Sequence, residues 1–129
     1  MSINQREEQE IFTSNKTSKK AMENLNELLL EKCEEGNLRE VLALLDRGAD
    51  INARNNYQNT PLHVACRYGK IEVMMVLLDR GADIHARDKY QCTPLHEACY
   101  YGKIEVMMAL LDRGADIHAR GIYLSLIHI

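Results

Sequence analysis

The chain has 129 residues, the size of one ordinary domain. Its hydrophobic share of 46% and charged share of 27% are typical of a soluble, folded protein. The formal net charge of -3 does not suggest a nucleic-acid partner, and no apolar run approaches the roughly 18 residues that span a bilayer. The first residues contain no signal-peptide core, so we expect a cytoplasmic protein without membrane association, with the nucleus as an alternative location.

The N-terminal part of the chain changes character near residue 20. Residues 1–20 are polar and mixed in charge, without apolar periodicity, and we predict that they are disordered. The following residues carry the sequence LLDRGAD, which begins at Leu44 and recurs at Leu77 and Leu110, each time 33 residues further on. A fixed period of this length predicts stacked structural repeats, which we place at 21–54, 55–87 and 88–120.

The second and third repeats are identical at 27 of 33 positions. The third contains TPLHEAC, in which His96, Glu97 and Cys99 could form half of a metal site or a nucleophile with its base. The second contains TPLHVAC, so Glu97 is replaced there by Val64 while the rest of the motif persists. A catalytic glutamate is not expected to vanish from a duplicated site, and we therefore interpret the motif as structural. The six differing position pairs are 55/88, 56/89, 59/92, 64/97, 67/100 and 76/109.

Each full repeat predicts a pair of helices. In the third repeat Thr93 is a good N-cap, Pro94 suits the first helical position, and Gly102 ends the helix in a left-handed conformation. A second helix is predicted from about Ile104 to Asp112. The apolar face expected for the first helix consists of Leu95, Ala98 and Cys99. The stripe expected for the second helix consists of Ile104, Met107, Leu110 and Leu111.

The 33-residue period with Thr-Pro-Leu-His-x-Ala resembles the ankyrin repeat, fully over Asn55–Arg120 and more loosely over Leu25–Arg54. The resemblance implies an all-α solenoid of stacked antiparallel helix pairs with hairpin loops, which binds other proteins. It also implies that the motif histidine bonds the Thr-Pro turn and the neighbouring repeat. The motif residues are Thr60, Pro61, Leu62, His63, Thr93, Pro94, Leu95 and His96.

The chain departs from the family pattern in two places. Gln58 and Gln91 occupy a turn position that the family usually gives to glycine, where a left-handed glutamine is strained by about 1 kcal/mol, so the turn type is open. Residues 21–54 lack Thr-Pro-Leu-His, and we interpret them as a degenerate capping repeat whose outer face meets water.

At the C-terminal end the repeat stays in register as far as Tyr123, so we interpret residues 121–123 as the start of another repeat. Leu124–Ile129, LSLIHI, match the translation of a transposon mosaic-end adapter, and we interpret them as a non-native tail. The alternative is a genuine apolar tail. If the tail is non-native, the chain is cut within a repeat, and we expect its last helix pair to be marginally stable and to fray.

The reactive side chains do not form a recognisable site. Stacked helices lie roughly 8–10 Å apart, too far for the equivalent His85 and His118 to share a zinc ion or for the column Cys33, Cys66 and Cys99 to form disulfides. We expect that column to be buried, and Cys92, at a hairpin tip, to be solvent-accessible. The chain contains no glycine-rich phosphate loop and no Ser/His/Asp arrangement. We expect no enzyme activity, cofactor, metal or small-molecule substrate.

The function we predict is binding of another protein through hairpin tips and the concave face of the first helices. Four of the six differing position pairs lie in or beside that surface, which favours selection for a partner over drift. Two alternatives stay open: the chain is the recognition arm of a larger enzyme or adaptor, or it is a structural spacer whose concave surface binds nothing. For Tyr57 and Tyr90 themselves, the alternative to partner binding is packing between adjacent hairpins. The candidate contacts are Asn56, Tyr57, Asn59, Arg67, Tyr68, Lys89, Tyr90, Cys92, Tyr100 and Tyr101.

Overall fold

The computed structural model describes residues 24–119, and over that range it contains helices and no strand. The all-α prediction is confirmed for these residues, whereas the predictions for residues 1–20, 121–123 and 124–129 lie outside the part that is described. None of the helices between residues 24 and 119 has both the length and the apolarity to cross a bilayer. The helices are 24–35, α2 (Leu38–Asp46), α3 (Pro61–Arg67), α4 (Ile71–Asp79), α5 (Pro94–Tyr100) and α6 (Ile104–Asp112).

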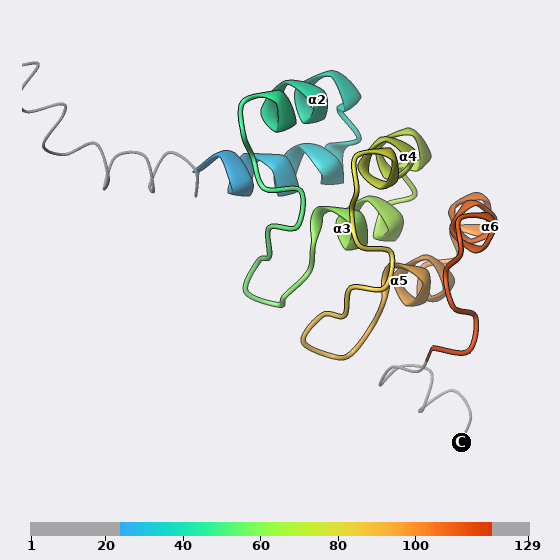
Figure 1. Cartoon of the computed structure of the whole chain (residues 1–129). Coiled ribbons are helices and arrows are strands. Elements are labelled where there is room, and N and C mark those ends of the chain that lie inside the picture. The colour runs from blue at the N-terminus through green and yellow to red at the C-terminus, as the bar shows by residue number, and fades with distance from the viewer. Residues whose placement is uncertain (1–23, 120–129) are drawn as a thin grey trace, which may run out of the picture.

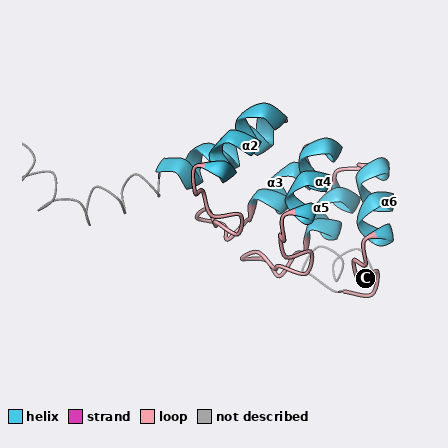
Figure 2. Cartoon of the chain, turned by 45° about the horizontal axis from the view of Figure 1, so that its top comes forward, coloured by secondary structure: helices cyan, strands magenta, loops and turns pink. Residues whose placement is uncertain are grey.

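The helices are arranged as three stacked pairs (Figure 1). Helix α3 contacts its own partner α4 and the first helix of the next pair, α5, while α4 contacts α2 and α6. The helix 24–35, α3 and α5 therefore form one row, and α2, α4 and α6 form a second. The loops that connect successive pairs project to the same side of the stack in both views, next to the first row (Figure 2).

The Thr-Pro motif starts the first helix of each full repeat as predicted. Thr60 is extended at the N-cap, its hydroxyl accepts a hydrogen bond from the His63 amide, and Pro61 occupies the first turn. The proline backbone nitrogen carries no proton, so Pro61 adds no unsatisfied N–H donor to the first turn of the helix. Thr93 and Pro94 repeat this arrangement at the start of α5.

The second helices have the bounds that the sequence predicts, but their buried face differs from the predicted stripe. Ile104 is 68% exposed, whereas Val106 and Leu110 are buried. At 3.6 residues per turn Val106 and Leu110 lie above one another, and Ile104 points far around the helix from both. Only Leu110 of the predicted stripe is fully buried, since Met107 and Leu111 are half-buried.

The hairpin turns keep the left-handed conformation although glutamine replaces glycine. Gln58 and Gln91 have φ of 63° and 64°, the only positive values among the described residues other than glycine. The Asn55 side chain supports the first turn by accepting hydrogen bonds from the amides of Tyr57 and Asn59, at 2.9 and 3.1 Å. These side-chain bonds hold the loop closed and offset the strain at the glutamine.

The core runs through the stack between the two rows of helices, and the column of equivalent cysteines shows its direction. Cys33 and Cys66 are fully buried, as predicted, but Cys99 is exposed. The prediction for Cys99 is wrong because burial of this position requires a following helix pair, and no described helix follows α6. The largest fully buried apolar side chains are Leu29, Leu62, Met74, Leu77, Leu110, Val41, Val73 and Val106.

Candidate protein-binding surface

Eight of the ten predicted contact residues are accessible in the structure. The five tyrosines among them are between 37% and 56% exposed, which is high for such large side chains. Two of these tyrosines lie at hairpin tips, and three lie at the C-terminal ends of α3 and α5. We refer to this set of exposed tyrosines, on the first row of helices and its loops, as the aromatic surface. The accessible residues are Asn56, Tyr57, Arg67, Tyr68, Lys89, Tyr90, Tyr100 and Tyr101.

Asn59 and Cys92 are buried, so their assignment to a contact surface is wrong. Asn59 is 2% exposed and Cys92 is 0% exposed. Both directly precede the N-cap threonine, where the chain turns back from the hairpin tip into the stack. The Cys92 amide donates a 2.9 Å hydrogen bond to Asp88 Oδ1, and its carbonyl faces the preceding repeat. A position within a loop is therefore not enough to make this thiol solvent-accessible.

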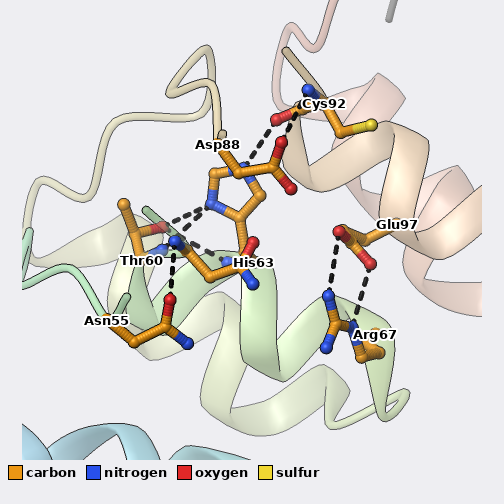
Figure 3. Close-up of polar contacts among 8 residues, drawn as sticks. Asn55, Thr60, His63, Arg67, Asp88, Cys92 and Glu97 are labelled. Atoms are coloured by element: carbon orange, nitrogen blue, oxygen red, sulfur yellow. Dashed lines mark hydrogen bonds and ion pairs between the residues drawn. The ribbon is translucent and has the colours of Figure 1, made fainter. Parts of the chain in front are cut away.

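The motif histidine His63 links two successive repeats, as the resemblance implied (Figure 3). The Thr60 amide donates to His63 Nδ1 at 3.2 Å, so the neutral ring carries its proton on Nε2, which donates to the Cys92 carbonyl at 2.8 Å. Burial lowers the pKa of His63 and keeps the ring neutral. His96 repeats the bond to its own threonine, since the Thr93 amide donates to His96 Nδ1 at 2.7 Å, but its Nε2 donates to the carbonyl of Ala119, within the same repeat, at 2.9 Å.

A partly buried ion pair joins α3 to α5, and the sequence prediction missed it. Arg67 Nε and Nη2 donate to the two carboxylate oxygens of Glu97 at 3.0 and 3.2 Å (Figure 3). The Glu97 side chain is only 4% exposed, and this burial raises its pKa although Arg67 acts in the opposite direction. Such a two-bond contact is among the stronger geometries for an ion pair.

Arg67 also supports the aromatic surface. Its guanidinium lies 5.5 Å from the ring centroid of Tyr101, which in turn meets Tyr100 edge-to-face at 4.9 Å. Glu97 therefore holds Arg67 in place against the exposed ring of Tyr101. The differing positions 64/97 and 67/100 contained a detectable signal, because a new acid in one repeat coincides with a base in the repeat before it.

The periodic aspartates also connect repeats. Asp46 accepts from Arg80 at 2.9 Å, and Asp79 accepts from Arg113 at 2.8 Å. Both aspartates are more than half exposed, so each pair contributes little to stability, on the order of 0–1 kcal/mol.

The described residues contain no group of three His, Cys, Asp or Glu side chains that could hold a metal ion. The buried thiols are poor nucleophiles, because burial raises the pKa of Cys33 to about 12 and also raises that of Cys66. One cleft of about 330 Å³ opens between the helix 24–35 and the first hairpin. Its lining residues are Asn26, Glu27, Leu30, Ala53, Arg54, Asn55 and Asn56.

Comparison with protein families identifies the repeats. The family model described as ankyrin repeats, in three copies, matches residues 23–121. A search of curated proteins finds no match for the chain. The matched range covers most of the 129 residues and includes all three helix pairs. The Thr-Pro start of each full repeat, the histidine link between repeats and the family match agree, and the chain belongs to the ankyrin-repeat family.

Proposed function

We propose that this chain binds another protein through the aromatic surface formed by its hairpin tips and the ends of α3 and α5. Ankyrin repeats are in general protein–protein interaction modules. The observation that carries the proposal here is the set of five exposed tyrosines on the first row of helices and its loops, since tyrosine and arginine are among the residue types that most often anchor interfaces.

The arrangement of this surface supports binding by direct side-chain contact. Tyr57 and Tyr90 belong to adjacent hairpins whose backbones are joined, because the Lys89 amide donates to the Tyr57 carbonyl at 2.9 Å. The surface is therefore held in shape before any partner arrives, which lowers the entropy cost of association. Tyr100 and Tyr101 extend it along α5.

A selection from a random peptide library displayed on phage tests the proposal and does not require that the partner be identified. We expect sequences that bind the full chain and lose at least about tenfold in affinity against Tyr100→Ala/Tyr101→Ala. The matched control is Glu72→Ala/Glu105→Ala, which changes two equivalent exposed residues on the second row of helices. Peptides that bind all three proteins equally, or no enrichment at all, would contradict the proposal and favour the structural-spacer alternative.

The alternative that the chain is the recognition arm of a larger enzyme or adaptor predicts the same surface. The two functions differ in whether a further domain is joined to the repeats. Reading the coding sequence on either side of this chain distinguishes a separate binding module from the arm of a larger protein.

A further inference from the structure

The similarity of the two full repeats creates an alternative way to stack. Residues 55–87 and 88–120 are identical at 27 of 33 positions, so most contacts that the second repeat makes with the first are available to the third as well. The third repeat could then pack directly on the first, with the second repeat looped out. A contact that differs between such similar repeats can therefore help to select the correct neighbour.

The positions that differ between α3 and α5 lie at the interface that such a slip would change. Glu97 points back from α5 towards the preceding repeat and is held by Arg67 through two hydrogen bonds. In the 33-residue register, Val64 of α3 takes the place of Glu97, and Glu34 of the first helix takes the place of Arg67. In the native stack Arg67 therefore meets a buried acid, and the same register places the exposed Glu34 opposite the apolar Val64.

A slipped stack would bring together the wrong side chains. With the third repeat seated on the first, Glu97 would face Glu34 in place of Arg67, which puts two acids together at a site where the native carboxylate is only 4% exposed. The Glu97 carboxylate would lose both hydrogen bonds, and like charges placed together at an interface are strongly disfavoured.

We infer that Arg67 and Glu97 fix the order in which the repeats of this chain stack. The pair stabilises the packing of the third repeat on the second and destabilises its packing on the first. It therefore acts mainly as a determinant of stacking specificity. Buried ion pairs are often worth little in net stability, and their best-attested role is to select one register or one partner. This inference concerns the folding of the chain itself and does not depend on the proposed binding function.

Crosslinking between engineered cysteines distinguishes the two stacks. Arg80 lies beside Asp46 and Arg113 beside Asp79, so a slip would place Arg113 beside Asp46. We would introduce Asp46→Cys with Arg113→Cys to detect the slip and Asp79→Cys with Arg113→Cys to detect the native stack. Both are made with Cys99→Ser, since Cys99 is an exposed thiol. The two thiols are joined with a bismaleimide that spans about one repeat, roughly 8–10 Å. The fraction of monomeric chain that carries an internal crosslink measures how often the two cysteines are neighbours.

Two variants test whether the Arg67–Glu97 pair selects the native stack. Arg67→Glu/Glu97→Arg restores an ion pair in the native stack but gives the slipped stack a favourable Glu34–Arg contact. Glu97→Val supplies the residue that the chain itself uses at the equivalent position, so it suits the site sterically. We expect the 46–113 crosslink to be lowest in the parent chain, higher in Glu97→Val, and at least roughly tenfold higher in the charge-exchanged variant.

The opposite result is equally clear. If the pair only stabilises the α3–α5 contact, the charge-exchanged variant will crosslink like the parent chain, and Glu97→Val will change the melting temperature alone. Equal 46–113 crosslinking in all three proteins would overturn the inference. If the charge-exchanged variant loses its helical circular dichroism, it does not fold and is set aside. The 46–113 crosslink in Glu97→Val is then compared with that in the parent chain, and equal crosslinking overturns the inference.

Discussion

The second and third helix pairs have almost the same sequence but not the same burial. Met74 of α4 is fully buried, whereas Met107, its equivalent in α6, is half-buried. Cys66 is buried and Cys99 is exposed. The α3–α4 pair lies between two neighbouring pairs, and the α5–α6 pair contacts one described neighbour. Neighbours, and not the repeat sequence alone, therefore determine how much each repeat contributes to stability.

Thiol labelling should show the largest difference between the two repeats. We expect Cys99 to react with an alkylating reagent in the native state at least about a hundred times faster than Cys66, because Cys66 is reached only through opening of the stack. Cys33 and Cys92 should be protected in the same way. Mass spectrometry of the alkylated chain measures each site. Similar rates at Cys66 and Cys99 would mean that the α3–α5 contact does not persist in solution.

A matched pair of core truncations should show the next largest difference. Met74→Ala leaves a cavity in a fully buried site and should lower the free energy of unfolding by about 2–4 kcal/mol. Met107→Ala removes a half-buried side chain and should cost roughly 1 kcal/mol. Urea denaturation followed by circular dichroism measures both. Equal costs would show that the two helix pairs are equally enclosed.

The motif histidines predict a pH dependence with a definite sign. Burial lowers the pKa of His63 in the folded chain below the unfolded value of about 6.5, so acid protonates the unfolded chain first. Stability from this residue is present above about pH 6.5 and is lost as the pH falls below it.

The contribution of Glu97 to stability depends on pH in the opposite direction. Its raised pKa favours the folded chain at low pH, and this contribution is lost as the pH rises above the usual carboxyl pKa near 4.3.

We expect His63→Ala to cost about 2–3 kcal/mol at neutral pH and clearly less near pH 5. His96→Ala should cost less, because His96 bonds the carbonyl of Ala119 in its own repeat, whereas His63 joins two repeats. The control is His85→Ala, which removes an exposed loop histidine. Denaturation curves at several pH values give these numbers, and a cost for His63→Ala that does not change with pH would contradict the assignment. Stoichiometric zinc that is lost on His96→Ala would contradict the structural role of that residue.

The smallest effect concerns the hairpin turns, and here the two repeats should behave alike. Gln58→Gly and Gln91→Gly each relieve a left-handed backbone, and each should stabilise the chain by a few tenths to about 1 kcal/mol. Gln58→Ala and Gln91→Ala remove the same side chain without relieving the strain and should be neutral. Melting temperatures test both sets, and a gain in the alanine variants would show that the side chain, not the backbone, is responsible.

Much of the fold is predictable because it depends on local sequence. The Thr-Pro start of α5, its end near Gly102 and the bounds of α6 follow from capping and turn preferences within a few residues. The role of His63 follows from the family resemblance, and its bond to the Thr-Pro turn recurs at His96.

The incorrect predictions concern contacts between repeats. The predicted burial of Cys99 is wrong because helical periodicity gives the face of a helix but not the presence of a neighbour to cover it. The predicted exposure of Cys92 is wrong because a loop position does not reveal which side chains turn inward. The Arg67–Glu97 pair escapes prediction because it joins positions that differ between repeats, whereas the repeat pattern is defined by the positions that are the same.

Hydrogen exchange followed by mass spectrometry is the most direct test of the claim that neighbours set the stability of each repeat. The helices Ile71–Asp79 and Ile104–Asp112 differ at one residue, Val76 against Ala109, so their intrinsic exchange rates are nearly equal. We expect the amides of Ile104–Asp112 to exchange faster, because that helix pair opens against one described neighbour and Ile71–Asp79 opens against two. Equal protection of the two helices, or slower exchange in Ile104–Asp112, would contradict the claim.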